Sequence, residues 1–221
     1  GKLEPARDAI QVALKNGPDY LPAMALGAEI YLQLGAAEQA ERLARQIVER
    51  VPNALQGHRL LAMSQMRMNA PDKAMQTLQL WLDRNVADPS LYSLAGEAAL
   101  RANDAVRSAA YFERAIQLDP TDPRKKTGLA FAHLAAGQQE RGIAELERVS
   151  ALPDSGSQAD LALIATHLRN RQFDKALAAI DQLEKKEPNG AMAPNLRGTA
   201  LLGKGDAAGA RKAFEQALSR D

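Results

Sequence analysis

A repeat period of about 34 residues runs through the whole chain and constrains its fold more than any other feature. Pro18, Pro52, Pro120 and Pro188 are separated from one another by whole multiples of this period. Small residues occupy a second phase of the same period, namely Ala6, Ala40, Ala74, Ser108, Gly142, Ala176 and Ala210. A period of this length with helical spacing inside it is typical of stacked helix-turn-helix units. The sequence therefore predicts an all-α, right-handed superhelical solenoid.

The composition agrees with that fold class and excludes several functions. Apolar residues make up 46% of the chain and aromatic residues only 4%, a balance that suits close-packed helices better than a sheet. A formal net charge of +1 gives no strong attraction to nucleic acid or to a membrane surface. The chain has no cysteine, which excludes disulfides and thiolate metal sites. No apolar run reaches the ~18 residues of a membrane-spanning helix.

The period divides the chain into one array of repeats. A half repeat (1–20) is followed by units at 21–54, 55–88, 89–122, 123–156, 157–190 and 191–221. Each unit should contain a helix A, a short turn and a helix B. The turns fall at Gly35, Asn69, Asn103, Gly137, Arg171 and Gly205. Glycine and asparagine tolerate left-handed backbone, so Arg171 is the exception. Because both ends cut through a unit, we expect a fragment of a longer protein.

Local signals mark helix starts and one irregular joint. Asp88 and Asp122 each precede a proline, which predicts N-caps. Ser157 and Asp160 resemble a capping box that has Asp in place of the usual Glu. The stretch 149–157 brings Pro153 one residue early and adds Ser-Gly-Ser, which predicts a softer joint there.

The residues of one unit carry a family resemblance. Tyr92, Gly96, Phe112, Ala115 and Pro120 follow the tetratricopeptide repeat pattern in order. The stretches 158–189 and 195–221 further resemble the PEP-CTERM-associated repeat lipoprotein of bacterial exopolysaccharide systems. This second resemblance implies a periplasm-facing envelope protein whose lipid anchor lies outside the fragment. A cytoplasmic location is the alternative.

The sequence predicts no enzyme, cofactor or metal site. His133 and His167 occupy equivalent positions in neighbouring units, but no aligned carboxylate joins them as a ligand. His58 is expected at the surface. The Gly-Lys pair within 203–212 lacks the spacing of a phosphate-binding loop, and no serine lies in a nucleophile motif.

The groove lined by the A helices is the candidate binding site. Its first unit contributes Pro22, Ala25, Glu29, Leu32 and Gln33, and Gln56 begins the next. The residues that we single out are Arg59, Met63, Met66, Arg67, Glu97, Arg101, Arg124, Phe131 and Arg169. Arg67, Arg101 and Arg169 share one phase and form an interrupted ladder. An extended anionic or mixed peptide would suit such a groove.

These features predict a protein–protein interaction scaffold. The envelope resemblance implies a role in exopolysaccharide export or in the sorting of PEP-CTERM proteins. Two alternatives remain open: a structural spacer whose groove stays empty, and a module that contacts an anionic polysaccharide. Self-association through exposed end repeats is a further expectation, because an uncapped solenoid exposes apolar end faces.

Overall fold

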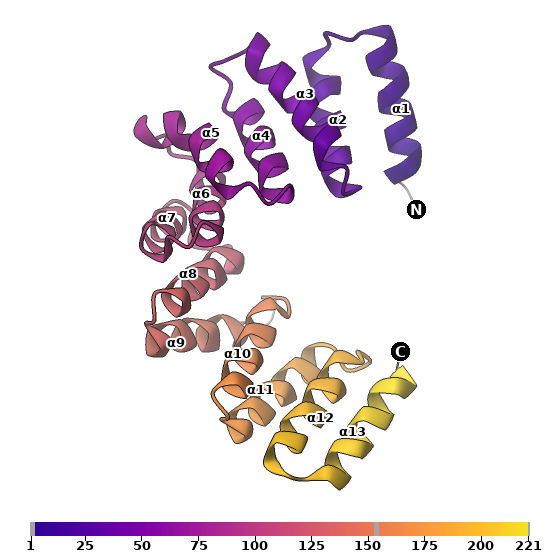
Figure 1. Cartoon of the computed structure of the whole chain (residues 1–221), viewed down its shortest axis with the longest axis vertical. Helices are drawn as coiled ribbons and strands as arrows, with labels where there is room; N and C mark the ends of the chain where they lie inside the picture. Colours follow the sequence, from indigo (N-terminus) through magenta and orange to yellow (C-terminus); the bar gives the residue numbers. More distant parts are fainter. Residues whose placement is uncertain (1–2, 153–154, 221) are drawn as a thin grey trace. The chain divides into compact units, whose positions relative to one another are not determined.

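The computed structural model describes residues 3–152 and 155–220, and in this part of the chain every regular element is an α-helix (Figure 1). The helices are α1 (Leu3–Asn16), α2 (Leu21–Gln33), α3 (Ala37–Arg50), α4 (Leu55–Arg67), α5 (Pro71–Asp83), α6 (Pro89–Arg101), α7 (Ala105–Leu118), α8 (Pro123–Ala135), α9 (Gln139–Ser150), α10 (Gln158–Arg169), α11 (Phe173–Lys186), α12 (Met192–Lys204) and α13 (Ala207–Arg220). Even-numbered helices are the predicted A helices and odd-numbered helices are the B helices. The predicted all-α solenoid of helical hairpins is confirmed.

The turn inside each hairpin has the predicted left-handed backbone. The φ angles are 76° at Gly35, 56° at Asn69, 60° at Asn103, 77° at Gly137, 54° at Arg171 and 86° at Gly205. Arg171 therefore makes the same turn as the glycines, although a side chain is disfavoured there. The next helix must begin in register, and this requirement outweighs the local preference.

Two of the three predicted helix starts are confirmed. Asp88 Oδ1 accepts hydrogen bonds from the backbone N–H groups of Ser90 and Leu91, both at 2.8 Å. Asp122 Oδ1 accepts one from the N–H of Arg124 at 2.9 Å. Each carboxylate satisfies backbone donors that the first turn of a helix leaves unpaired.

The predicted capping box at α10 is wrong. The Ser157 side chain makes no cap hydrogen bond, and Asp160 is completely buried. Asp160 instead accepts a hydrogen bond from the hydroxyl of Ser150 and pairs with Lys186 Nζ at 2.7 Å. The carboxylate thus joins the ends of α9 and α11 to the start of α10, because a buried charge needs a partner more than a helix end needs a cap.

Small residues let the two helices of a hairpin approach closely. Small residues of the A helices, namely Ala28, Ala62 and Gly96, are buried. A Cβ atom on Gly96 would lie 2.8 Å from the ring of Phe112, and one on Gly198 would lie 2.5 Å from the ring of Phe214. Each of these glycines therefore accommodates an aromatic side chain of the following B helix.

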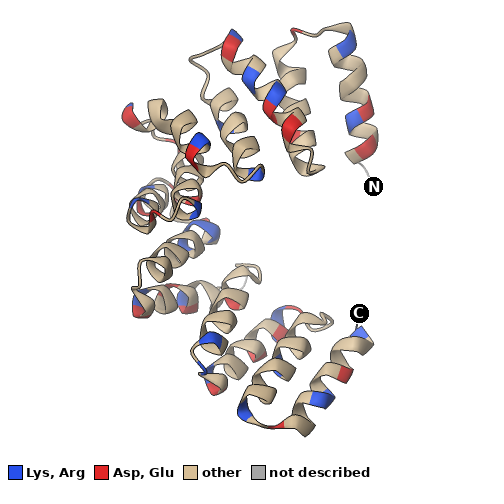
Figure 2. Ribbon diagram, in the orientation of Figure 1, with Lys and Arg blue, Asp and Glu red and all other residues tan. Residues whose placement is uncertain are grey.

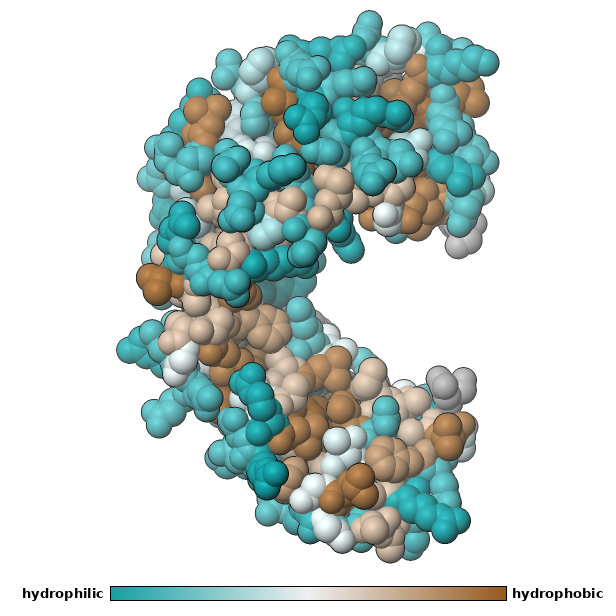
Figure 3. Space-filling model, in the orientation of Figure 1, coloured by the Kyte–Doolittle hydropathy of each residue, from teal (hydrophilic) through white to brown (hydrophobic). Residues whose placement is uncertain are grey.

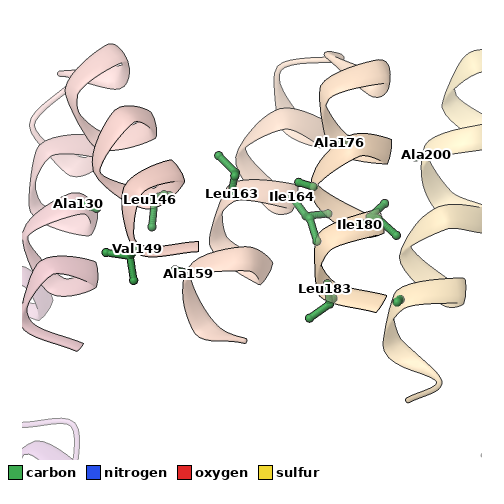
Figure 4. Close-up of a cluster of buried hydrophobic side chains, with 12 residues drawn as sticks. Ala130, Leu146, Val149, Ala159, Leu163, Ile164, Ala176, Ile180, Leu183 and Ala200 are labelled. Carbon is green, nitrogen blue, oxygen red and sulfur yellow. The ribbon is translucent and has the colours of Figure 1, made fainter. Parts of the chain in front are cut away.

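The helices divide into two compact units, Gly1–Pro120 and Thr121–Asp221. Figure 4 shows a core of the second unit, in which Leu146 and Val149 of α9, Ile164 of α10, and Ile180 and Leu183 of α11 are buried together. The first unit has its own cores around α2–α4 and α4–α6. The boundary follows Pro120 and does not fall in the irregular stretch at 149–157. Pro153, on which the predicted softer joint depends, lies outside the described residues.

Within the described residues, no helix combines the length and the apolar character that crossing a bilayer requires.

Candidate functional site

A cleft of about 490 Å³ separates the A helices α2 and α4 in the first unit. Its lining comprises Glu29, Leu32, Gln33, Gln56, Arg59, Leu60, Met63 and Arg67. A second hollow of about 410 Å³ shares Glu29 and Gln56 with it and extends toward the start of α2. The two hollows lie next to each other along the A helices α2 and α4.

Three of the predicted site residues line this cleft. Arg59, Met63 and Arg67 follow one another at intervals of four residues, so they share one face of α4. Met63 keeps 40% of its surface exposed, so it presents apolar surface at the cleft. The guanidinium of Arg59 already has an acidic partner, because its Nη1 lies 3.4 Å from Asp88 Oδ2. Sequence reasoning missed this pairing, since 29 residues separate the partners.

Met66 is not a groove residue, and that prediction is wrong. Only 5% of its surface is exposed, and it packs in the core with Ala62, Met75 and Leu78. It lies one turn after Ala62 on α4, so it shares the buried face of that helix.

The arginine ladder is only partly realised. In the first unit, Arg101 Nη1 donates a hydrogen bond to the backbone oxygen of Met66 at 3.1 Å. The guanidinium thereby satisfies a carbonyl in the last turn of α4, a common role for arginine at helix ends. Arg67 takes part in no hydrogen bond or ion pair among residues 3–152 and 155–220, and it faces the cleft. Glu97 is exposed on α6, one turn before Arg101.

The candidates in the second unit have different surroundings. Arg124 folds back on its own helix cap, with its Nη2 2.9 Å and its Nε 3.0 Å from the two oxygens of Asp122. The hydrogen bond from the Arg124 side chain lowers the pKa of Asp122, although burial opposes the shift. Phe131 is half-buried on α8, and Arg169 is exposed at the end of α10.

The A helices of the two units differ in surface chemistry. Figure 3 shows hydrophobic residues gathered over the α10–α12 region of the second unit, among the charged residues that Figure 2 marks on these helices. Leu202 and Met192 of α12 are 58% and 49% exposed. The groove positions of the first unit instead carry Glu29, Arg59 and Arg67. The cleft between α2 and α4 therefore has charged groups on both of its walls.

His58 and His167 make contacts with neighbouring side chains of the fold. His58 is 9% exposed, and its ring meets that of Trp81 edge-on with 5.4 Å between centroids, so its predicted surface position is wrong. Nδ1 of His167 lies 2.8 Å from Oε1 of Gln172. In the part of the chain that the structure describes, no three His, Asp or Glu side chains gather as metal ligands would.

Comparison with known families decides the classification. Residues 25–91 and 161–221 match a model of the tetratricopeptide repeat, and residues 99–157 match a second model of the same repeat. The chain belongs to the tetratricopeptide repeat family. Tetratricopeptide repeats generally mediate protein–protein interactions and are generally not enzymes. No curated protein matches the chain.

Solved structures share the fold at low sequence identity. A tetratricopeptide repeat protein from Parabacteroides merdae ATCC 43184 matches the whole chain with a TM-score of 0.76 and 15% identity, over 87% of its own length. The APC/C hetero-tetramer Cut9–Hcn1 matches with a TM-score of 0.74 and 14% identity, and the chain spans 43% of that protein. YrrB, described as having an unusual peptide-binding site, matches 98% of the chain and 94% of its own with a TM-score of 0.51 and 13% identity.

Proposed function

We propose that this tetratricopeptide array is a scaffold segment that binds a protein partner through a peptide laid in the cleft between α2 and α4. The observation that supports this most directly is the cleft itself. It combines an exposed apolar side chain, Met63, with polar groups on both walls, including Gln33 and Arg67. A concave surface with an apolar floor and a few converging polar groups is the usual form of a binding site. The relative YrrB is described as having a peptide-binding site, which agrees with this assignment.

Peptide display separates this function from the spacer alternative. Random 12-residue peptides would be selected on the intact chain, and the best binders measured by fluorescence anisotropy. We expect Met63→Lys to weaken binding by roughly tenfold or more, because it replaces the exposed apolar side chain of the cleft with a charge. Val106→Lys is the matched control, since Val106 is 76% exposed on the B helix α7. Selected peptides that bind both variants as well as the parent would overturn the cleft assignment.

The wider cellular role rests on sequence resemblance alone. We propose that the array belongs to a bacterial envelope lipoprotein of an exopolysaccharide or PEP-CTERM sorting system, with the array facing the periplasm. The supporting observation is the likeness of 158–189 and 195–221 to that lipoprotein family. Fractionation of cells that express the complete gene product, with and without globomycin to block lipoprotein processing, would test the proposal. A product found entirely in the cytoplasm would contradict it.

A further inference from the structure

We propose that the cleft between α2 and α4 is specific for an extended, acidic peptide in which an apolar side chain stands two residues away from a carboxylate. The inference rests on the proposed function, because it assigns a ligand chemistry to the same cleft.

The positive charge available at the cleft comes from Arg67 of α4. Arg59 lies near Asp88, and Arg101 of α6 is bound to the carbonyl of Met66. Arg67 has no such partner among residues 3–152 and 155–220, and it is exposed at the cleft. An arginine fork binds a carboxylate through two parallel hydrogen bonds. Arg67 can therefore bind the carboxylate of an acidic side chain in the ligand.

The apolar position is set by Met63, one helical turn before Arg67. Its side chain is 40% exposed, while Leu32 and Leu60 of the same cleft are 6% and 4% exposed and form the floor. Methionine adapts to varied apolar partners, which suits a peptide anchor. Four residues of α-helix rise by about 6 Å. Residues i and i+2 of an extended strand are about 6.6 Å apart and point to the same side. The two subsites therefore match alternate residues of an extended ligand.

The remaining polar groups favour an extended ligand and orient it. Gln33 and Gln56 stand on opposite walls, and each carries both a donor and an acceptor. An extended segment has unpaired backbone groups for these amides to bind, whereas a helix pairs its own. Glu29 lies one turn before Gln33 on α2, away from Arg67 in the register of the A helices. Its carboxylate disfavours an acidic side chain at that end and so selects the end that Arg67 occupies.

The test compares selections of random 12-residue peptides on three forms of the intact chain: the parent, Arg67→Gln and Met63→Lys. On the parent we expect enrichment of an apolar residue two positions from Asp or Glu. Arg67→Gln should abolish the acidic preference, keep the apolar one, and lower the affinity of a parent-selected peptide about tenfold at low salt. At 0.5 M NaCl the difference between parent and Arg67→Gln should shrink. An unchanged urea midpoint of Trp81 fluorescence would show that each variant is folded.

The outcomes separate this inference from the proposed function. Peptides that require Met63 but show no preference for Asp or Glu would overturn the acidic specificity and leave the cleft as a peptide site. The absence of any peptide that requires Met63 would overturn both. A labelled oligogalacturonate that bound the cleft more tightly than every selected peptide would replace the peptide with an anionic polysaccharide.

Discussion

At the scale of single residues, Gly35 and Gly96 are favoured for different physical reasons. Gly35 has a φ of 76° with nothing near its missing Cβ, so the constraint is conformational. Gly96 lies inside α6, and an added Cβ would meet the Phe112 ring at 2.8 Å, so the constraint is space. The two positions recur in every repeat, because each hairpin has a turn between its helices and a point where helix A crosses helix B.

The two glycines therefore predict different costs of substitution. Gly96→Leu should destabilise the first unit by about 3 kcal/mol, because the closely packed crossing has no room for the side chain. Gly35→Ala should cost only about 1 kcal/mol, the strain of a left-handed alanine. Urea titration followed by Trp81 fluorescence would measure both.

Gly35→Asn is the matched control for the turn. Asn69 and Asn103 hold equivalent turns at φ of 56° and 60°, so this variant should remain close to the parent in stability. Equal urea midpoints for Gly96→Leu and Gly35→Ala would contradict the distinction between space and conformation.

At the scale of helices, Asp160 determines how α9, α10 and α11 are joined. The carboxylate is fully buried and pairs with Lys186, whose ammonium also donates to Ser155 Oγ at 3.1 Å. Within the described residues, the joint is thus held by a polar cluster as well as by the neighbouring apolar core. Such a cluster is sensitive to the loss of one member, since the remaining charge is left without its partner.

Removal of Asp160 should therefore be costly. We expect Asp160→Ala to destabilise the second unit by about 3–5 kcal/mol, and Asp160→Ala combined with Lys186→Met to recover part of that loss. Far-UV circular dichroism in urea is the measurement, because the second unit contains neither Trp nor Tyr. A single variant as stable as the parent would mean that the buried pair is not important for the joint.

At the scale of the whole molecule, each of the two units has its own buried core. The stability of a repeat array is approximately the sum of its repeats and their nearest-neighbour interfaces. Such an array does not have to unfold in one step. The single Trp and all four Tyr residues lie before Pro120, so intrinsic fluorescence observes the first unit alone.

Unfolding should consequently depend on the probe. We expect the urea midpoint from Trp81 fluorescence to differ from the midpoint from far-UV circular dichroism, which reports both units. In addition, Gly96→Leu should move the fluorescence midpoint more than it moves the dichroism midpoint. Coincident transitions for the parent and the variant would instead show that the chain unfolds as one cooperative unit.

The repetitive features of the fold could be predicted from the sequence. Hairpin turns, close crossings and buried positions recur once in every repeat, and each follows from local sterics or helical spacing that the residue type reveals. Even Arg171, an unfavourable residue for its turn, was located correctly by its phase. The same register predicts a groove along the A helices, and the binding role of that groove stays a prediction.

The tertiary structure alone decided which of the phased side chains remain available. Arg101 is hydrogen-bonded to the carbonyl of Met66, 35 residues earlier, and Arg59 lies near the helix-capping Asp88, 29 residues later. Asp160 forms a buried ion pair with Lys186 and does not cap α10 as predicted. Periodicity reports the direction in which a side chain leaves its helix. The hydrogen-bond or ion-pair partner of that side chain depends on the residues of neighbouring helices, whose length and charge do not repeat with the period. The sequence therefore determined the helical hairpins, and only packing determined that Arg67 and Met63 remain exposed at the cleft between α2 and α4.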